Sequence, residues 1–350
     1  MDLVSRLKAE AKKNVKTIVF PEGENPAIIQ AAVKMQKEGL ADPILIGSVQ
    51  RIKEIMKDLL LKNDPVMKDT IKDLAAKGLA VKELVTKDLV IIDPVKNELL
   101  PDYIGKYCEE RKMPEAAGKR IISQPLYFAA MMVKEGAAMG MVAGIDHPTE
   151  EVIMASELIF GLQENISVPS SFYLLEIPNW EGAQGNMIIF SDPSMNPDPN
   201  AAELADIACT TAHSARTLLG WEPKAALLSF STKGSGDHPC VTKIQNAVEL
   251  LKQRNCDFLF DGELQADAAI NPAIGKKKTG GAGQVAGFAN ILIFPDLNAC
   301  NISSKLVQQM AGAKCYGPIL QGFRFPVSDL SRGASVDDII GSTLLTAAAK

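Results

Sequence analysis

Short apolar segments alternate with longer amphipathic segments along all 350 residues of the chain. The short segments are rich in β-branched and aromatic residues, which favour strands. They cover residues 16–20, 43–47, 89–93, 139–144, 171–177, 186–191, 225–231, 257–262, 290–296 and 316–322. Between them, helical periodicity marks residues 25–38, 66–76, 126–137, 201–218, 241–254 and 303–312. This alternation predicts an α/β protein with mostly parallel sheets and flanking helices.

Length and charge limit the classes of protein to which the chain can belong. A single core stops growing near ~250–300 residues, so the length predicts two domains. The net charge of −5 argues against non-specific binding to nucleic acid, which requires a broad positive face. The N-terminal segment 1–16 lacks the apolar core of a signal peptide, and no segment approaches the ~18 apolar residues of a membrane span. We therefore expect a cytoplasmic protein with no membrane partner.

The six cysteines and three histidines are scattered along the chain. No C-x-x-C pair occurs, and His147, His213 and His238 do not cluster with the cysteines. This spacing argues against a structural zinc site and against a disulfide framework. We expect reduced thiols and no bound metal, and His147 is the better candidate for chemistry because it follows the end of a predicted strand.

Two glycine-containing loops deserve comparison with known phosphate-binding patterns. The loop S-T-K-G-S-G at 231–236 follows a predicted strand, and its N–H groups, hydroxyls and ammonium suit phosphate oxygens. It lacks the Walker pattern, and an ordinary strand–helix loop explains it equally well. The stretch G-A-G-Q-V-A at 281–286 fits the dinucleotide pattern but runs into a strand instead of opening a helix. Together with the absence of a clear aspartate-rich metal motif, this context disfavours a nicotinamide-dependent dehydrogenase, which remains the alternative enzyme class.

The segment P-V-S-D-L-S-R-G-A-S-V-D-D-I-I-G-S at 326–342 is unusually rich in charge for a turn before a helix. Ser335 and Asp338 have the spacing of a capping box, and apolar residues continue at helical spacing. Capping alone does not explain Arg332, because a cation near the positive end of a helix is unfavourable unless an anion lies between them. The segment therefore predicts an anionic ligand.

Five motifs in order along the chain resemble those of the phosphate acetyltransferase (phosphotransacetylase) family. They are S-T-K-G-S at 231–235, D-G-E-L-Q-A-D-A-A at 261–269, N-I-L-I-F-P-D-L-N at 290–298, Y-G-P-I-L-Q-G at 316–322 and D-L-S-R-G-x-S-x-x-D at 329–338. The resemblance covers essentially the whole chain. It implies reversible transfer of an acyl group, most simply acetyl, between coenzyme A and inorganic phosphate.

The resemblance also implies roles for individual residues. Asp338 aligns with the base that removes the coenzyme A thiol proton, Ser331 with a hydrogen-bond donor at the reacting centre, and Arg332 with the arginine that holds phosphate. Arg111 matches an arginine that binds coenzyme A. Substrate-binding positions are also expected at Ser231, Thr232, Lys233, Ser235, Glu263 and Asn301. The expected mechanism is direct attack of the thiolate on the acyl phosphate, with no covalent enzyme intermediate and no metal.

A carboxylate is a weak base for this step. Model aspartate has a pKa near 3.9 and a thiol near 8.5, a gap of roughly 4.6 units or about 6 kcal/mol. Proton removal by Asp338 therefore requires desolvation of the carboxylate, or stabilisation of the thiolate by Arg332 and the helix N-terminus.

Several positions depart from the family pattern. Met154 stands where an arginine is usual, the loop before it carries Ile145-Asp146 and Pro148, and the stretches 281–287 and 300–305 are altered. These changes leave the acyl group open. A propionyl- or butyryl-specific enzyme and a coenzyme-A-binding homologue with weak or no catalysis remain alternatives.

The resemblance further implies an architecture like that of isocitrate and isopropylmalate dehydrogenases. Domain I is expected to combine residues 1–160 with 318–350, domain II to hold 161–317, and the cleft to lie between them. The implied partners are small molecules, namely acyl-CoA, phosphate and acyl phosphate, with no tightly bound cofactor. A homodimer is also implied.

Overall fold

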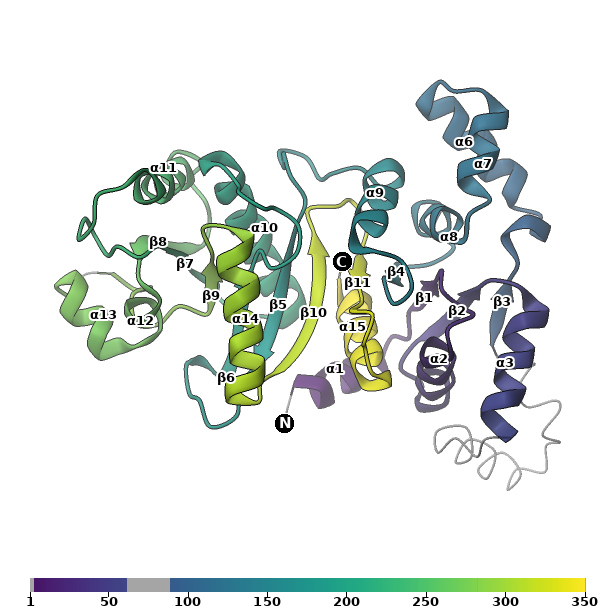
Figure 1. Ribbon diagram of the computed structural model, residues 1–350, viewed down its shortest axis with the longest axis horizontal. Helices are drawn as coiled ribbons and strands as arrows, with labels where there is room; N and C mark the ends of the chain where they lie inside the picture. Colours follow the sequence, from purple (N-terminus) through teal and green to yellow (C-terminus); the bar gives the residue numbers. More distant parts are fainter. Residues whose placement is uncertain (1–2, 62–88, 282, 350) are drawn as a thin grey trace. The chain divides into compact units, whose positions relative to one another are not determined.

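The computed structural model describes residues 3–61, 89–281 and 283–349, and these divide into two compact units (Figure 1). The first unit is Met1–Gly161 with Phe323–Ala348, and the second is Leu162–Gly322. The predicted α/β class is confirmed, and each predicted strand segment overlaps an observed strand. The predicted helix at 66–76 lies outside the described residues. The domain boundaries, in the sense of parts that fold independently, stay a prediction.

The first unit contains five parallel strands in the order β3-β2-β1-β4-β11. Their bounds are Thr17–Phe20 for β1, Asp42–Ile46 for β2, Val90–Ile92 for β3, Gly140–Ala143 for β4 and Val327–Asp329 for β11. The chain builds outward from β1 to β2 and β3, and then returns to the other side of β1 with β4. The carboxyl ends of β1 and β4 therefore form a topological switch point, which is where open α/β sheets bind ligands.

The helices of the first unit pack on this sheet or on one another. They are α1 Leu3–Ala11, α2 Pro26–Glu38, α3 Val49–Leu61, α6 Leu100–Arg111, α7 Glu115–Ile122, α8 Pro125–Lys134, α9 Thr149–Ile159 and α15 Val336–Ala348, with a short 3₁₀ turn at Pro94–Lys96. The local sequence defines α2 well: Asn25 caps it by accepting from the Ala27 N–H, Pro26 occupies its first turn, and Gly39 ends it in the left-handed conformation. None of the described helices is long and apolar enough to span a lipid bilayer.

Strand β11 was not predicted from the sequence. It joins the C-terminal segment to the sheet of the first unit, where Val327, Ser328 and Asp329 pair in parallel with β4 (Figure 1). All three residues are buried, and the Ser328 hydroxyl lies 2.6 Å from the Thr346 hydroxyl on α15. The strand escaped prediction because it is short and two of its three side chains are polar, so it carries no apolar pattern.

The second unit contains six strands in the order β10-β5-β6-β9-β7-β8. Their bounds are Ser170–Glu176 for β5, Ala183–Ser191 for β6, Lys224–Leu228 for β7, Leu259–Leu264 for β8, Ile291–Ile293 for β9 and Lys314–Gln321 for β10. Pairs β10–β5 and β5–β6 are antiparallel, whereas β6–β9, β9–β7 and β7–β8 are parallel. Helices α10 Ala201–Leu219, α11 Pro239–Gln253, α12 Ala266–Ile270, α13 Pro272–Thr279 and α14 Leu297–Ala311 complete the unit.

Candidate active site

The turn after β11 presents a hydroxyl and a guanidinium to solvent. The Leu330 N–H donates to the Ala143 carbonyl at 2.7 Å, which holds the end of β11 against β4, and the chain then turns where the Ala334 N–H donates to the Ser331 carbonyl at 2.9 Å. Ser331 and Arg332 are exposed on this turn. Arg332 has no hydrogen bond or ion pair with the residues that the structure describes, so its charge is available to an anion.

Asp338 lies in the first turn of α15 and forms a capping box with Ser335, the residue before the helix. Its Oδ2 accepts from the Ser335 N–H at 2.9 Å and from the Ser335 hydroxyl at 2.7 Å, and the Asp338 N–H donates to the same hydroxyl at 3.2 Å. The predicted cap is confirmed. The carboxylate is also exposed, so it is not desolvated in the way that a base for a thiol requires. Its catalytic role stays a prediction.

Arg111 stands at the last turn of α6 and caps a neighbouring helix. Its Nη2 donates to the Glu157 carbonyl at 3.4 Å and to the Leu158 carbonyl, which are at the C-terminal end of α9. A cation at this position complements the helix dipole. Arg111 is nevertheless exposed, so coenzyme A binding and helix capping both remain available to it.

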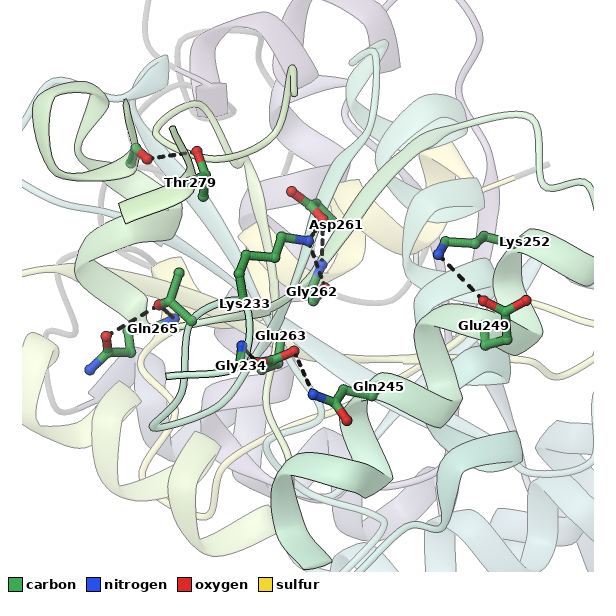
Figure 2. A network of polar contacts seen from close by, with 12 residues as sticks. Lys233, Gly234, Gln245, Glu249, Lys252, Asp261, Gly262, Glu263, Gln265 and Thr279 are labelled. Carbon is green, nitrogen blue, oxygen red and sulfur yellow. Dashed lines mark hydrogen bonds and ion pairs between the residues drawn. The ribbon is translucent and has the colours of Figure 1, made fainter. Parts of the chain in front are cut away.

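In the second unit, the loop after β7 closes around a buried carboxylate (Figure 2). Glu263 on β8 is 2% exposed, and its carboxylate accepts from the Gly234 N–H at 2.6 Å, the Ser231 hydroxyl at 3.0 Å and the Gln245 amide at 3.2 Å. Burial acts to raise the pKa of Glu263, but these hydrogen bonds outweigh it and the pKa is lowered. The carboxylate therefore stays ionised and holds the loop.

This closure uses every backbone N–H from 231 to 236. The acceptors are, in order along the loop, the Ser229 hydroxyl, the Ser235 hydroxyl, the Glu263 carbonyl, the Glu263 carboxylate, the Thr232 carbonyl and the Ser231 hydroxyl. The Glu263 carboxylate is therefore the anion that this loop binds. In this conformation the N–H groups of the loop are not free to bind a phosphate. A substrate would meet the outer side chains of the loop instead.

Lys233 and Thr232 attach the same loop to β8 and to the residue after it. The Lys233 ammonium pairs with the Asp261 carboxylate and donates to the Gly262 carbonyl at 2.8 Å (Figure 2). The Thr232 hydroxyl accepts from the Gln265 N–H at 3.0 Å. The structure thus brings together Ser231, Thr232, Lys233, Ser235 and Glu263. Asn301 on α14 instead donates its amide to the Pro193 carbonyl at 3.1 Å.

A second polar cluster, at the switch point of the first unit, was only partly anticipated. The Glu22 carboxylate, directly after β1, accepts four consecutive N–H groups after β4, from Gly144, Ile145, Asp146 and His147, at 2.8–3.1 Å. It also lies 2.8 Å from His147 Nδ1. Burial acts to raise the pKa of Glu22, yet the hydrogen bonds from His147 and the backbone lower it overall.

Asp329, the last residue of β11, lies beside this cluster. It is 2% exposed; Oδ2 accepts from the Thr149 hydroxyl at 2.6 Å, whereas Oδ1 is buried with no hydrogen-bond partner. Burial raises the pKa of Asp329 to about 7, and the nearby Glu22 charge adds to the rise. Gly144 is required here, since its φ is +105° and an added Cβ would lie 2.0 Å from Asp329 Oδ1.

This cluster could hardly be predicted from local sequence patterns, because Glu22 and His147 are 125 residues apart, and Thr149 and Asp329 are 180 residues apart. The only available signal was the position of each residue next to a strand end. Within the described residues, no group of three or more His, Cys, Asp or Glu is placed to hold a metal ion. The described part of the glycine stretch 281–286 lies between α13 and β9 and does not open a helix.

Comparison with known proteins identifies relatives along the full length. The chain matches the family model described as Phosphate acetyl/butaryl transferase over residues 2–347. It is 41% identical over 350 residues to a phosphate acetyltransferase from Thermoanaerobacterium thermosaccharolyticum, with 99% of each chain covered. A phosphate acetyltransferase from Clostridium acetobutylicum is 38% identical over 349 residues, covering 99% of this chain and 98% of the relative.

Solved structures give the same result. A phosphotransacetylase from Streptococcus pyogenes superposes with a TM-score of 0.86 at 34% identity, covering 99% of this chain and 98% of that one. A 4-hydroxythreonine-4-phosphate dehydrogenase from Klebsiella pneumoniae has a TM-score of 0.51 at 11% identity, with 96% of this chain and 100% of that chain covered. The second likeness concerns the fold alone, and it agrees with the dehydrogenase-like architecture predicted from the sequence.

Replacing Glu263 with Gln should destabilise the second unit. The amide places hydrogens against the donors that now meet a carboxylate, which leaves buried donors unsatisfied at a cost of about 1–3 kcal/mol. Urea unfolding measures the loss, and Glu222→Gln, at an exposed carboxylate, serves as the control. Equal stability of the two variants would contradict the anchoring role of Glu263.

Replacing Asp329 with Asn should flatten the pH dependence of stability. The unfolded chain releases this proton near pH ~4, whereas the folded chain holds it to about pH 7. The free energy of unfolding therefore falls as the pH rises through this interval. His147, whose pKa is raised, contributes a fall of the same sign and is present in both proteins.

The measurement is urea unfolding at several pH values between about 4 and about 8. Asp329→Asn should lose free energy of unfolding less steeply than the wild type, and Asp58→Asn, at an exposed carboxylate, should follow the wild type. Parallel curves for the wild type and Asp329→Asn would show that Asp329 is ionised in the folded protein.

Proposed function

This chain belongs to the Phosphate acetyl/butaryl transferase family, and we propose that it reversibly transfers an acetyl group between coenzyme A and inorganic phosphate. The observation that carries this proposal is the 41% identity, over the full length, to a phosphate acetyltransferase. Coenzyme A is then a substrate and not a resident cofactor. The substrates are small molecules, which agrees with polar groups gathered at strand ends in both units.

The guanidinium of Arg332, which has no hydrogen bond or ion pair within the described residues, supports an anionic substrate at the turn after β11. Acyl phosphate and inorganic phosphate are both anions, and a guanidinium matches two phosphate oxygens at once. In the direction of acyl-CoA formation, the thiolate attacks the acyl carbonyl, the carbon–oxygen bond to phosphate breaks, and phosphate leaves. Arg332 then holds the phosphate while Ser331 donates to the oxygen on which charge develops.

The other assignments are part of the same proposal. Asp338 is the base for the thiol, Arg111 contacts coenzyme A, and the side chains of the loop 231–235 with Glu263 and Asn301 line the substrate site. Because Glu263 is buried and occupied by the loop, its contribution is to hold the loop in shape. The two-domain organisation with a cleft, a homodimer and a cytoplasmic location complete the proposal.

A second candidate differs only in the acyl group. The description of the family model names both acetyl and butyryl transfer. Met154, which is exposed on α9, stands where the resemblance described above implies an arginine. An apolar side chain in that position favours a longer acyl chain if it faces the substrate. A coenzyme-A-binding homologue without turnover is the remaining alternative.

The decisive experiment is an acyl-CoA panel. Free thiol is measured after mixing the protein with acetyl-, propionyl- or butyryl-CoA, with and without phosphate. We expect phosphate-dependent thiol release, fastest with acetyl-CoA. Faster release with butyryl-CoA would move the assignment to the second candidate, and no release from any of them would refute the acyltransferase assignment.

Asp338→Asn should lower turnover by a hundredfold or more, which is the usual effect of losing a general base. The neighbouring variant Asp337→Asn is a matched control, because Asp337 is also an exposed carboxylate in the first turn of α15 but pairs with Lys34. Stopped-flow or steady-state thiol release measures both variants. Wild-type turnover in Asp338→Asn would leave Asp338 as a helix cap only.

A further inference from the structure

Two free thiols lie against each other in the second unit. The Sγ atoms of Cys209 and Cys256 are 3.5 Å apart, and both side chains are partly buried. A disulfide bond is about 2.05 Å long, so a covalent link requires the two sulfurs to approach each other by about 1.5 Å. The acyl transfer proposed above uses neither thiol.

The fold brings these cysteines together although they are 47 residues apart in the sequence. Cys209 lies on α10, and Cys256 lies in the connection between α11 and β8. Helices α10 and α11 pack against each other (Figure 1). Asn255, directly before Cys256, has a φ of +52°, a left-handed conformation that Asn adopts more readily than most residues. This turn after the end of α11 places Cys256 against α10.

An ion pair joins the same two segments. The Arg254 guanidinium donates to the Asp206 carboxylate at 2.6 Å, and Asp206 is 2% exposed. Asp206 is three residues before Cys209 on α10, and Arg254 is two residues before Cys256. Arg254 also forms a hydrogen bond with the Cys209 sulfur. A cation beside a sulfur favours the thiolate, which is the reactive form of cysteine.

The surroundings of the pair fit oxidation better than metal binding. Zinc sites in proteins use three or four protein ligands. Among the residues that the structure describes, no third His, Cys, Asp or Glu joins these two thiols in a group that could hold a metal ion. Two thiols in contact, without further ligands, are the arrangement from which a disulfide forms.

We propose that Cys209 and Cys256 form a reversible disulfide when a hydroperoxide oxidises the protein. The Cys256 sulfur attacks the peroxide, the oxygen–oxygen bond breaks, and Cys256 becomes a sulfenic acid while its proton leaves with the other oxygen as alcohol or water. The Cys209 sulfur then attacks the Cys256 sulfur, and the hydroxyl group leaves as water with the Cys209 proton. The two thiols lose two electrons, which reduce the peroxide, and a dithiol reverses the reaction by exchange.

The environment of Cys209 sets the order of these steps. Burial raises the pKa of the Cys209 thiol to about 12, and the neighbouring Cys256 adds to the rise, whereas Arg254 opposes it. Cys209 therefore stays protonated near neutral pH, and a protonated thiol is a poor nucleophile. Cys256 reacts with the oxidant first, and Cys209 loses its proton beside Arg254 only when it closes the bond.

The disulfide ties α10 to the connection that leads into β8. Strand β8 carries Asp261 and Glu263, which hold the loop 231–236. A cross-link restricts the unfolded chain, and the restriction grows with the length of the loop that it closes. Oxidation should therefore stabilise the second unit and raise its thermal midpoint by about 4 °C or more.

The wild-type protein provides a test that does not depend on the folding of a variant. It is treated with hydrogen peroxide until the exposed Cys240 is oxidised, alkylated, and digested without reduction. We expect a linked peptide that contains Cys209 and Cys256, and we expect dithiothreitol to separate it. The buried Cys300 is an internal control that should stay reduced. Oxidation of Cys240 without the linked peptide would overturn the proposal.

Two variants test the order of the steps. In Cys209→Ser the sulfenic acid of Cys256 has no thiol to attack it, so it should accumulate and react with dimedone. In Cys256→Ser, Cys209 should give little dimedone adduct. Cys240→Ser is the matched control and should form the disulfide with the same rise in thermal midpoint as the wild type.

Each contrary result removes a defined part of the inference. Equal dimedone labelling of Cys209 in Cys256→Ser and of Cys256 in Cys209→Ser would contradict the order of attack. A disulfide-linked wild type with an unchanged thermal midpoint would contradict the stabilising effect. None of these readouts requires acyl transfer, so a failure here is distinct from a failure of the proposed function.

Discussion

A buried carboxylate that binds a loop through its backbone N–H groups is the interaction on which both units depend. The Glu22 carboxylate accepts hydrogen bonds from the backbone N–H groups after β4, and the Glu263 carboxylate accepts them from the loop after β7. A buried charge is costly unless hydrogen bonds replace the lost water, and here backbone and side-chain donors replace it. Because each glutamate follows or ends a strand beside the loop that it binds, the loop is fixed to the sheet.

The same arrangement separates two nearby carboxyl groups into different protonation states. Glu22 receives five hydrogen bonds and stays ionised, whereas Asp329 receives the hydroxyl of Thr149 on one oxygen and no donor on the other. Environments that push the pKa values of two carboxyl groups apart are characteristic of sites that transfer protons. In this protein, Glu22 fixes the ring of His147 through a hydrogen bond. Asp329 is the last residue of β11, so it directly precedes the turn that contains Ser331 and Arg332.

Particular residues show how far sequence reasoning reached. The capping box of Ser335 and Asp338 was predictable because it is local, and so were the strand segments, whose apolar pattern is continuous. The loop 231–236 was correctly located after a strand, but its acceptor could not be predicted, since Glu263 is on another strand. The hydrogen bond between Glu22 and His147 could not be predicted for the same reason, because the two residues are far apart in the sequence and no local pattern links them.

The amino-acid sequence by itself determined the α/β class, the positions of most strands, the helix cap at Asp338 and the family, because each depends on short-range periodicity or on an ordered set of local motifs. Tertiary structure alone decided that β11 completes the first sheet, that Glu22 supports His147 and that Asp329 is buried beside them. These features depend on strand order, and strand order brings together residues that are more than a hundred positions apart, where no local pattern records the contact.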